Sequence, residues 1–144
     1  MIVLFTGQPG SGKTTLAKAL IDDCSDNCLH LDGDELREFF KNDDYSKEGR
    51  INHIENIFNM VGFIENKGFT VIISMVSPFK TIRDNLKEKY GAIEVFTHTD
   101  EIRGREHFFA EYYEKPTENY IDIDTGINSI KESLNLISYN KKTS

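Results

Sequence analysis

The most informative spacing in this sequence runs from Gly7 to Thr14, where the residues read Gly-Gln-Pro-Gly-Ser-Gly-Lys-Thr. This stretch fits the pattern G-x-x-x-x-G-K-S/T, whose glycines let consecutive backbone N–H groups point at phosphate oxygens. In this pattern the lysine, here Lys13, contacts the β- and γ-phosphates, and the hydroxyl, here Thr14, ligates Mg²⁺. A strand-like run precedes the stretch and a helix-like run follows it, which disfavours a chance match in a glycine-rich turn. The stretch therefore predicts binding of ATP with Mg²⁺. The predicted phosphate-binding residues are Gly7, Gln8, Pro9, Gly10, Ser11, Gly12, Lys13, Thr14 and Thr15.

A pair of carboxylates, Asp32 and Asp34, follows the second strand-like run. Residues i and i+2 of an extended segment point the same way, so both carboxylates can face the γ-phosphate. In phosphoryl transfer one such group holds water on Mg²⁺ and the other accepts the proton of the attacking hydroxyl. We assign the first role to Asp32 and the second to Asp34. The alternative is a solvated Asp-Gly turn, and the phosphate loop in the same chain favours catalysis. The candidate catalytic residues are Lys13, Asp32 and Asp34, and the candidate metal ligands are Thr14 and Asp32.

Two arginines are placed to bind an anionic acceptor. Arg37 comes three residues after Asp34 and is expected on the same side of a short helix, where a guanidinium can pair with a phosphate or phosphosulfate. Arg50 lies in the first turn of a long predicted helix, where the helix dipole disfavours a cation. A ligand therefore explains Arg50 better than a surface pair with Glu48 or Asp44.

Strand-like segments alternate with helical patterns along the chain. Strands are expected at 2–6, 29–31, 69–75, 93–97 and 120–124. Helices are expected after the phosphate loop, at 35–41, at about 47–66, from 78 to about 90, and around 127–137 with a cap at Thr125 or Asn128. This alternation predicts an α/β fold, namely a P-loop NTPase-type three-layer α/β/α sandwich with a five-stranded parallel sheet. Ligands should then gather at the carboxyl ends of the strands, where four loops converge. These are loops 7–14, 32–37, 76–79 and 98–116.

The bulk composition limits the classes of partner. The chain has 144 residues and a net charge of −7. These values predict one domain over residues 1–139 with a short lid at about 98–116, and a disordered tail at 140–144. The negative charge argues against nucleic acid and anionic membranes as partners and leaves a small-molecule substrate. No apolar run approaches a membrane helix and no leader is expected before the first strand, so we expect a cytoplasmic location. A homodimer is left open.

Cys24 and Cys28 are the only cysteines, and His30 is the only histidine close to them. The spacing is poor for a metal site, because such a site needs more ligands nearby. We therefore predict a pair of reduced, inert thiols. The polar segment 22–27 around them is expected to be a turn.

Several segments, in the same order, resemble adenylylsulfate (APS) kinases. They are the phosphate loop, the L-D-G-D-E-L-R element at 31–37, Tyr45-Ser46 with Arg50, and Val76-Ser77-Pro78-Phe79 with Arg83. Weaker similarity continues through 113–116 and 121–125. The resemblance implies transfer of the γ-phosphoryl group of ATP to the 3′-hydroxyl of APS, which gives 3′-phosphoadenylylsulfate and ADP. It also implies that Tyr45 stacks on the adenine of APS. The implied APS-binding residues are Asp34, Arg37, Tyr45, Arg50, His53, Val76 and Ser77.

The chain departs from the family pattern at three places. Glu35 stands where the family commonly has Asn, which adds a charge near an anionic acceptor. His53 replaces the family's Asn three residues beyond Arg50. The long lid of the family, with its R-D-x-K-G-L-Y element and a second stacking Phe, is trimmed to a short segment here.

We expect the trimmed lid to do the same work with fewer residues. Arg103 or Arg105 would supply the cation that neutralises charge on the transferring phosphate, and Phe108 or Phe109 would close over the adenine opposite Tyr45. The alternative is that the two phenylalanines only cover the edge of the sheet.

Three other functions share parts of this pattern. The departures at Glu35, His53 and the lid make a kinase for another small hydroxyl acceptor, such as an APS-like nucleotide, a sugar acid or an antibiotic, the main alternative. A 5′-polynucleotide kinase would need a basic groove, which the net charge of −7 argues against. A regulatory nucleotide switch would need an Asn-Lys-x-Asp element, and the sequence has none.

Overall fold

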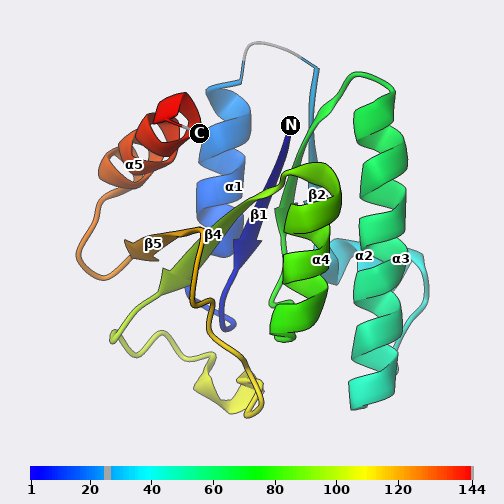
Figure 1. The fold of residues 1–144 in the computed structure, drawn as a ribbon. Coiled ribbons are helices and arrows are strands. Elements are labelled where there is room, and N and C mark those ends of the chain that lie inside the picture. The colour runs from blue at the N-terminus through cyan, green and yellow to red at the C-terminus, as the bar shows by residue number, and fades with distance from the viewer. Residues whose placement is uncertain (25–26, 144) are drawn as a thin grey trace.

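Five parallel strands form a single sheet in the order β2-β3-β1-β4-β5. Figure 1 shows the computed structural model, which describes residues 1–24 and 27–143. The strands are β1 (Ile2–Thr6), β2 (Cys28–Asp32), β3 (Thr70–Ser74), β4 (Ile93–His98) and β5 (Tyr120–Asp124). The helices are α1 (Lys13–Asp22), α2 (Gly33–Phe39), α3 (Lys47–Asn66), α4 (Lys80–Tyr90) and α5 (Ile130–Thr143), with a short 3₁₀ turn, η1, at Glu106–Phe108.

Helices cover both faces of the sheet, with α1 and α5 on one side and α3 and α4 on the other (Figure 1). Since both faces are covered, the central strands are apolar on both sides, and all of β1 is buried. Successive side chains along a central strand point to opposite faces of the sheet and therefore enter two separate cores. Leu4 packs with Ile57 of α3, whereas its neighbour Phe5 packs with Leu16 of α1. The predicted three-layer sandwich with a five-stranded parallel sheet is confirmed.

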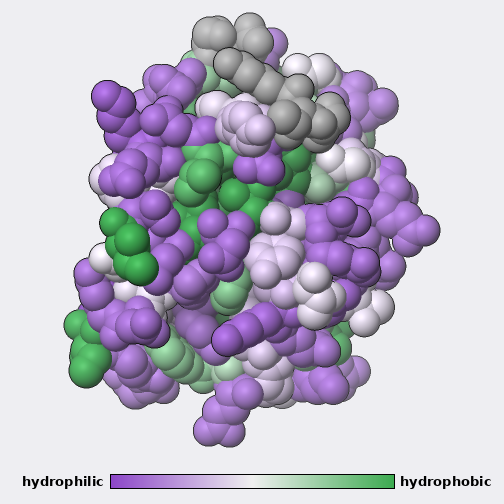
Figure 2. All heavy atoms as spheres, turned by 60° about the vertical axis from the view of Figure 1, so that its left-hand side comes forward, coloured by the Kyte–Doolittle hydropathy of each residue, from purple (hydrophilic) through white to green (hydrophobic). Residues whose placement is uncertain are grey.

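The outer surface follows the amphipathic pattern of the helices. Figure 2 shows a mainly hydrophilic face, with one hydrophobic area in the upper half of the view. In the described ranges, 1–24 and 27–143, no helix is long and apolar enough to cross a membrane.

Helices α2 and α4 start at other residues than the sequence predicts, because a side-chain cap decides the first turn of α2 and the backbone conformation before α4 delays its start. Helix α2 starts at Gly33 rather than 35, since the Asp32 carboxylate caps it by accepting from Asp34 N–H at 3.0 Å. Helix α4 starts at Lys80 rather than 78, since Ser77 has a positive φ of 43° and Phe79 is extended.

Helix α5 differs from its expectation at both ends. It starts at Ile130, where Ser129 and Glu132 form a reciprocal capping box, so neither Thr125 nor Asn128 is the cap. It continues to Thr143, through residues expected to belong to a disordered tail. Of that tail, Ser144 lies outside the described residues.

The prediction of reduced thiols is wrong for this structure, in which Cys24 and Cys28 are paired as a disulfide. The end of α1 and the start of β2 bring the two Cα atoms to 6.5 Å, within the usual range for such a bond. Residues 25–26 of the predicted turn lie outside the described residues. The pair lies at the amino end of β2, away from the carboxyl ends of the strands.

Candidate active site

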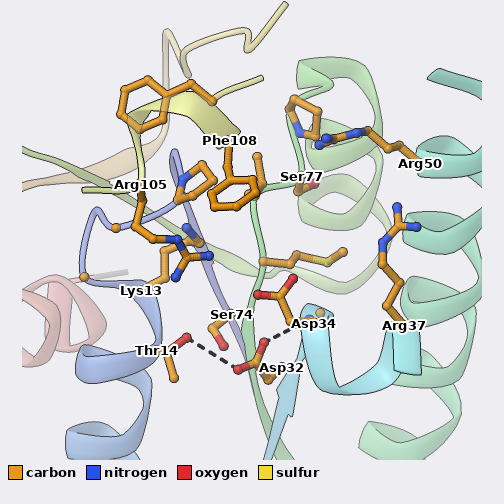
Figure 3. A pocket seen from close by; sticks show the side chains of 18 of the residues that line it. Lys13, Thr14, Asp32, Asp34, Arg37, Arg50, Ser74, Ser77, Arg105 and Phe108 are labelled. Carbon is orange, nitrogen blue, oxygen red and sulfur yellow. Dashed lines mark hydrogen bonds between the residues drawn. The ribbon is translucent and has the colours of Figure 1, made fainter. Parts of the chain in front are cut away.

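A cavity of about 910 Å³ opens at the carboxyl ends of the strands. The phosphate loop, the start of α2, the start of α3, the segment after β3 and the lid (residues 98–116) all contribute to it (Figure 3). Most of the predicted site residues meet there. They are Pro9, Gly10, Gly12, Lys13, Thr14, Thr15, Asp32, Asp34, Arg37, Tyr45, Arg50, His53, Val76, Ser77, Arg103, Arg105, Phe108 and Phe109.

Three predicted phosphate-binding residues, Gly7, Gln8 and Ser11, are absent from the cavity wall. The Gln8 side chain exchanges two hydrogen bonds of 2.9 Å with the peptide groups of Ala110, and so holds the lid. The Ser11 hydroxyl is buried against the Thr97 hydroxyl at 2.7 Å. The side chains of Gln8 and Ser11 therefore support the loop from behind.

The phosphate loop has the backbone shape that an anion cradle needs. Gly10 and Gly12 have φ values of +81° and +103°, a region in which residues with a Cβ are strained. Gly12 is also the residue before α1, so the loop leads directly into a helix N-terminus. The backbone N–H groups and the positive end of the helix dipole both favour an anion at this place.

Lys13 is buried beside the cavity. Its ammonium donates to the carbonyl of Gln8 at 2.8 Å, a neutral partner. Burial lowers the pKa of Lys13 to about 8, while Asp34 and Asp32 act in the opposite direction and Arg105 reinforces the lowering. An anion bound next to Lys13 would restore its pKa, so this lysine is suited to pair with phosphate.

The two predicted carboxylates have different surroundings. Asp32 caps α2 and accepts from the Thr14 hydroxyl at 3.5 Å. Within the described residues, no hydrogen bond or ion pair engages the carboxylate of Asp34, which lies beside Asp32 at the cavity wall (Figure 3). Asp34 is therefore available to a ligand in the cavity.

A hydroxyl and a carboxylate side by side are hard oxygen donors, which fit Mg²⁺. Thr14 and Asp32 supply them here. In the described part of the chain no cluster of three or more His, Cys, Asp or Glu side chains could hold a metal ion. Magnesium that is bound mainly through nucleotide phosphates needs no such cluster, because it uses only one or two protein carboxylates.

The wall opposite Lys13 carries two arginines and a tyrosine from α2, α3 and the loop between them (Figure 3). The Arg37 guanidinium lies 4.1 Å from the centre of the Tyr45 ring and donates to the carbonyls of Asn42 and Asp44. Arg50 lies 5.9 Å from the same ring. In the described part of the chain neither arginine pairs with a carboxylate, so the alternative pair of Arg50 with Glu48 or Asp44 is not formed.

The departures Glu35 and His53 play different parts from the ones expected. Glu35 is exposed and absent from the cavity wall, so its charge is not added to the site. His53 is buried, and its Nε2–H donates to the carbonyl of Gly33 at 2.9 Å. Burial lowers the pKa of His53, which favours the neutral ring. One nitrogen of His53 therefore supports the Asp32-Gly33-Asp34 turn and is not free for a ligand.

Ser77 combines two unusual features at the cavity wall. Its φ of +43° is rare for a residue with a side chain. Its hydroxyl is buried and has no hydrogen-bond partner in the described part of the chain. Buried polar groups are normally paired, and an exception of this kind asks for an explanation. A ligand in the adjoining cavity would provide the missing partner.

The structure separates the two lid arginines that sequence reasoning left as alternatives. Arg103 donates to the carbonyl of Gly10 at 2.9 Å and to both oxygens of Thr125, and it pairs with Glu101. In the part of the chain that the structure describes, Arg105 has no such partners; it points into the cavity toward Lys13 and lies 5.3 Å from the Phe108 ring (Figure 3). Arg105 is therefore the arginine that can reach a bound phosphate.

We expect Arg105→Gln to lower kcat roughly 10- to 150-fold, which corresponds to losing one charged hydrogen bond of about 1.5–3 kcal/mol. Arg103→Gln should mainly lower the melting temperature, because it removes bonds that hold the phosphate loop to the loop after β5. Steady-state kcat at saturating substrates and thermal unfolding of both variants test this difference. A larger loss of kcat in Arg103→Gln would contradict the assignment.

Sequence reasoning missed a buried charged group beside the site. Arg83 and Glu94 are 0% and 1% exposed and pair at 2.6 Å, and Lys87 reaches the other oxygen of Glu94. A glutamate in the middle of an otherwise apolar strand was the available signal, since a buried charge requires a partner. The prediction of a strand at 93–97 did not use this signal.

A phosphate loop after the central strand, paired carboxylates at the end of β2 and a lid that carries an arginine define a phosphate-loop kinase. A family profile described as adenylylsulphate kinase matches residues 1–135. An adenylyl-sulfate kinase of Pseudomonas aeruginosa is 32% identical over 139 residues, which cover 92% of this chain and 71% of that protein. The chain therefore belongs to the adenylylsulphate kinase family. It is an ATP-dependent kinase that phosphorylates a hydroxyl group, as the sequence predicts.

Two further comparisons describe the range of this similarity. A cytidine diphosphoramidate kinase of Campylobacter jejuni is 31% identical over 131 residues, covering 85% of this chain and 77% of that protein. The APS kinase of Mycobacterium tuberculosis, solved in complex with AMPPNP and APS, superposes with a TM-score of 0.76. It is 21% identical over 95% of this chain and 96% of that chain, and it shows the shared fold.

Proposed function

We propose that this kinase transfers the γ-phosphoryl group of ATP to the 3′-hydroxyl of adenosine 5′-phosphosulfate. The position of Asp34 carries the proposal. Its carboxylate, which is unpaired among the described residues, lies between a wall with Lys13 and Arg105 and a wall with Arg37 and Arg50 (Figure 3). An anionic phosphate donor and an anionic acceptor can therefore bind on opposite sides of the Asp34 carboxylate.

On the donor side, the phosphate loop and two cations hold the triphosphate. The β-phosphate faces the backbone N–H groups of the loop residues on the cavity wall, Gly10, Gly12, Lys13 and Thr14, and Lys13 and Arg105 neutralise the γ-phosphate. Thr14 and Asp32 would hold Mg²⁺, which supplies further neutralisation of phosphate charge when it is bound. The lid, joined to the loop through Gln8, excludes water that would hydrolyse ATP.

On the acceptor side, the two arginines bind the phosphosulfate and Tyr45 stacks on the base. Asp34 accepts the proton of the 3′-hydroxyl while the 3′-oxygen bonds to the γ-phosphorus. The bond from that phosphorus to the β–γ bridging oxygen breaks, and ADP leaves with the electron pair. The buried hydroxyl of Ser77 has no hydrogen-bond partner among the described residues, which supports a further contact to the acceptor.

Cytidine diphosphoramidate is the second candidate acceptor. It is favoured by the Campylobacter jejuni relative and by His53, which stands where the APS pattern has Asn and whose Nε2 is bonded to the carbonyl of Gly33. Both candidates are nucleotides with a second anionic or polar centre beyond the 5′-phosphate. The proposed arginine and tyrosine contacts serve either of them.

An ADP-release assay tests the proposal with Mg²⁺, ATP and four acceptors: APS, cytidine diphosphoramidate, gluconate and a 5′-hydroxyl oligonucleotide. We expect turnover with APS, and ³¹P NMR of the product should show a new 3′-phosphomonoester. Turnover with cytidine diphosphoramidate alone would replace APS with the second candidate. Turnover with gluconate or the oligonucleotide alone would overturn both.

Stacking over the acceptor base gives a separate prediction for the lid. Phe108 and Phe109 both line the cavity, and the Phe108 ring lies between Arg105 and Ser77 (Figure 3). We expect Phe108→Ala to raise the acceptor KM about 5- to 150-fold, equivalent to ~1–3 kcal/mol of stacking, and to leave the KM for ATP unchanged. Kinetics of Phe108→Ala and Phe109→Ala measure both constants. If neither variant raises the acceptor KM, the stacking role is wrong.

A further inference from the structure

The turn at Val76 and Ser77 depends on residues far from it in sequence. It follows β3, and both residues line the cavity. Figure 3 shows Ser77 across the cavity from Lys13. Ser77 has a φ of +43°, a conformation that persists in a residue with a side chain only where the surroundings hold it. Two separate sets of hydrogen bonds stabilise this conformation.

The first set starts at Arg83, which is completely buried. One terminal nitrogen of its guanidinium donates to the carbonyl of Ser77 at 2.7 Å, and the other donates to the carbonyl of Glu114 in the lid. Its Nε donates to Glu94 at 2.6 Å, which fixes the plane of the guanidinium. Arg83 thus joins the end of the lid to the cavity wall through a single rigid group.

The second set starts at Tyr113, also in the lid. The hydroxyl of Thr6 donates to the carbonyl of Val76 at 2.7 Å, so its only proton is used there. The contact of 2.7 Å between the Tyr113 and Thr6 hydroxyls must therefore have Tyr113 as the donor. Burial raises the pKa of Tyr113 to about 12, which keeps that proton in place at neutral pH.

We infer that Arg83 and Tyr113 are positioning residues, which set the backbone of Val76 and Ser77 for the acceptor and couple it to the lid. The inference rests on the proposed function, in which this turn contacts the acceptor. The ring of Tyr113 is held independently of its hydroxyl, because it stacks on Phe96 at 5.9 Å and lies under Arg83. Removal of the hydroxyl alone therefore tests the hydrogen bond and leaves the packing.

Two variants and two matched controls test the inference. Tyr113→Phe removes one hydroxyl. Tyr112→Phe is its control, since the neighbouring ring stacks on Phe79 and its hydroxyl makes no hydrogen bond within the described residues. Arg83→Lys removes the guanidinium that donates to the carbonyls of Ser77 and Glu114. Lys87 still pairs with Glu94 in this variant. Lys80→Met is the control on the same helix, because its ammonium bonds Asp84 and not the turn.

We expect Tyr113→Phe to raise the acceptor KM about two- to tenfold, and Arg83→Lys to raise it more, with the KM for ATP within about twofold of the wild type. If Arg83 and Tyr113 only stabilised the fold, the substitutions would lower the melting temperature and would not raise the acceptor KM more than the KM for ATP. Hydrogen–deuterium exchange of the peptide 75–79 in the free protein should be faster in both variants than in the controls. This second readout needs no acceptor.

The outcomes separate the inference from the proposed function. Unchanged acceptor KM together with unchanged exchange in folded Tyr113→Phe overturns the inference and leaves the proposed acceptor intact. If the wild type phosphorylates neither candidate nucleotide, the proposed acceptor fails, and the exchange of peptide 75–79 still decides whether Arg83 and Tyr113 hold the turn. If Arg83→Lys does not fold, Tyr113→Phe carries the test alone.

Discussion

Replacement of Asp34 with Asn is expected to lower kcat by about 10²–10⁴-fold, the range for loss of a general base. The amide keeps the size of the side chain but cannot accept the proton of the attacking hydroxyl. Affinity for ATP should stay the same or increase slightly, because the wild-type carboxylate lies near the phosphates and repels them. Steady-state kinetics and calorimetric ATP titration of the variant measure the two effects.

Glu35→Gln is the matched control for this prediction. It removes the same charge one residue further along α2, where the carboxylate lies outside the cavity. We expect its kcat to stay within about twofold of the wild type. If Asp34→Asn keeps more than about a tenth of the activity, the proton acceptor is another group.

The second large effect is expected at Lys13. Lys13→Met should lower kcat/KM by about 10²–10³-fold, since it removes a cation aimed at the charge that develops on the γ-phosphate. Lys18→Met removes an exposed lysine from the same helix and should have no effect on turnover. Equal activity of the two variants would remove Lys13 from the site.

The pKa of Lys13 allows a second test of its role in binding ATP, namely the pH dependence of ATP affinity. Burial lowers this pKa to about 8 in the free protein, and the charged form is the one that binds phosphate. ATP affinity should therefore fall as the pH rises through 8, about tenfold by pH 9, because only the protonated fraction binds. Lys13→Arg does not titrate in this range, so its affinity should stay flat across the same buffers.

Local patterns were enough to predict the fold. Each strand is a short run that is either largely apolar or alternates apolar with polar residues, and each helix repeats apolar residues every three or four positions, so the order of elements can be read from neighbouring residues. The ends of elements were less accurate, as α5 shows. Its capping box at Ser129 and Glu132 competes with two equally good candidates nearby, and only the folded chain selects among them.

The candidate site, too, was predictable from the sequence only where its residues belong to local motifs. The phosphate loop and the pair Asp32 and Asp34 are contiguous motifs, and the structure brings them to one cavity as expected. The lid was predictable only as a segment. Whether Arg103 or Arg105 faces the phosphates depends on where Gly10 and Thr125 lie relative to it, and those residues are distant in sequence.

The sequence by itself determined a nucleotide-binding kinase fold, because that information resides in short motifs and in periodicity. Only the tertiary structure decided that His53 turns to Gly33, that Glu94 is neutralised by Arg83, and that the Cys24 and Cys28 thiols are paired. It also decided that Tyr113 reaches Thr6, which is 107 positions away. These contacts join groups whose mutual position is set by the packing of whole elements, and no local pattern encodes that packing.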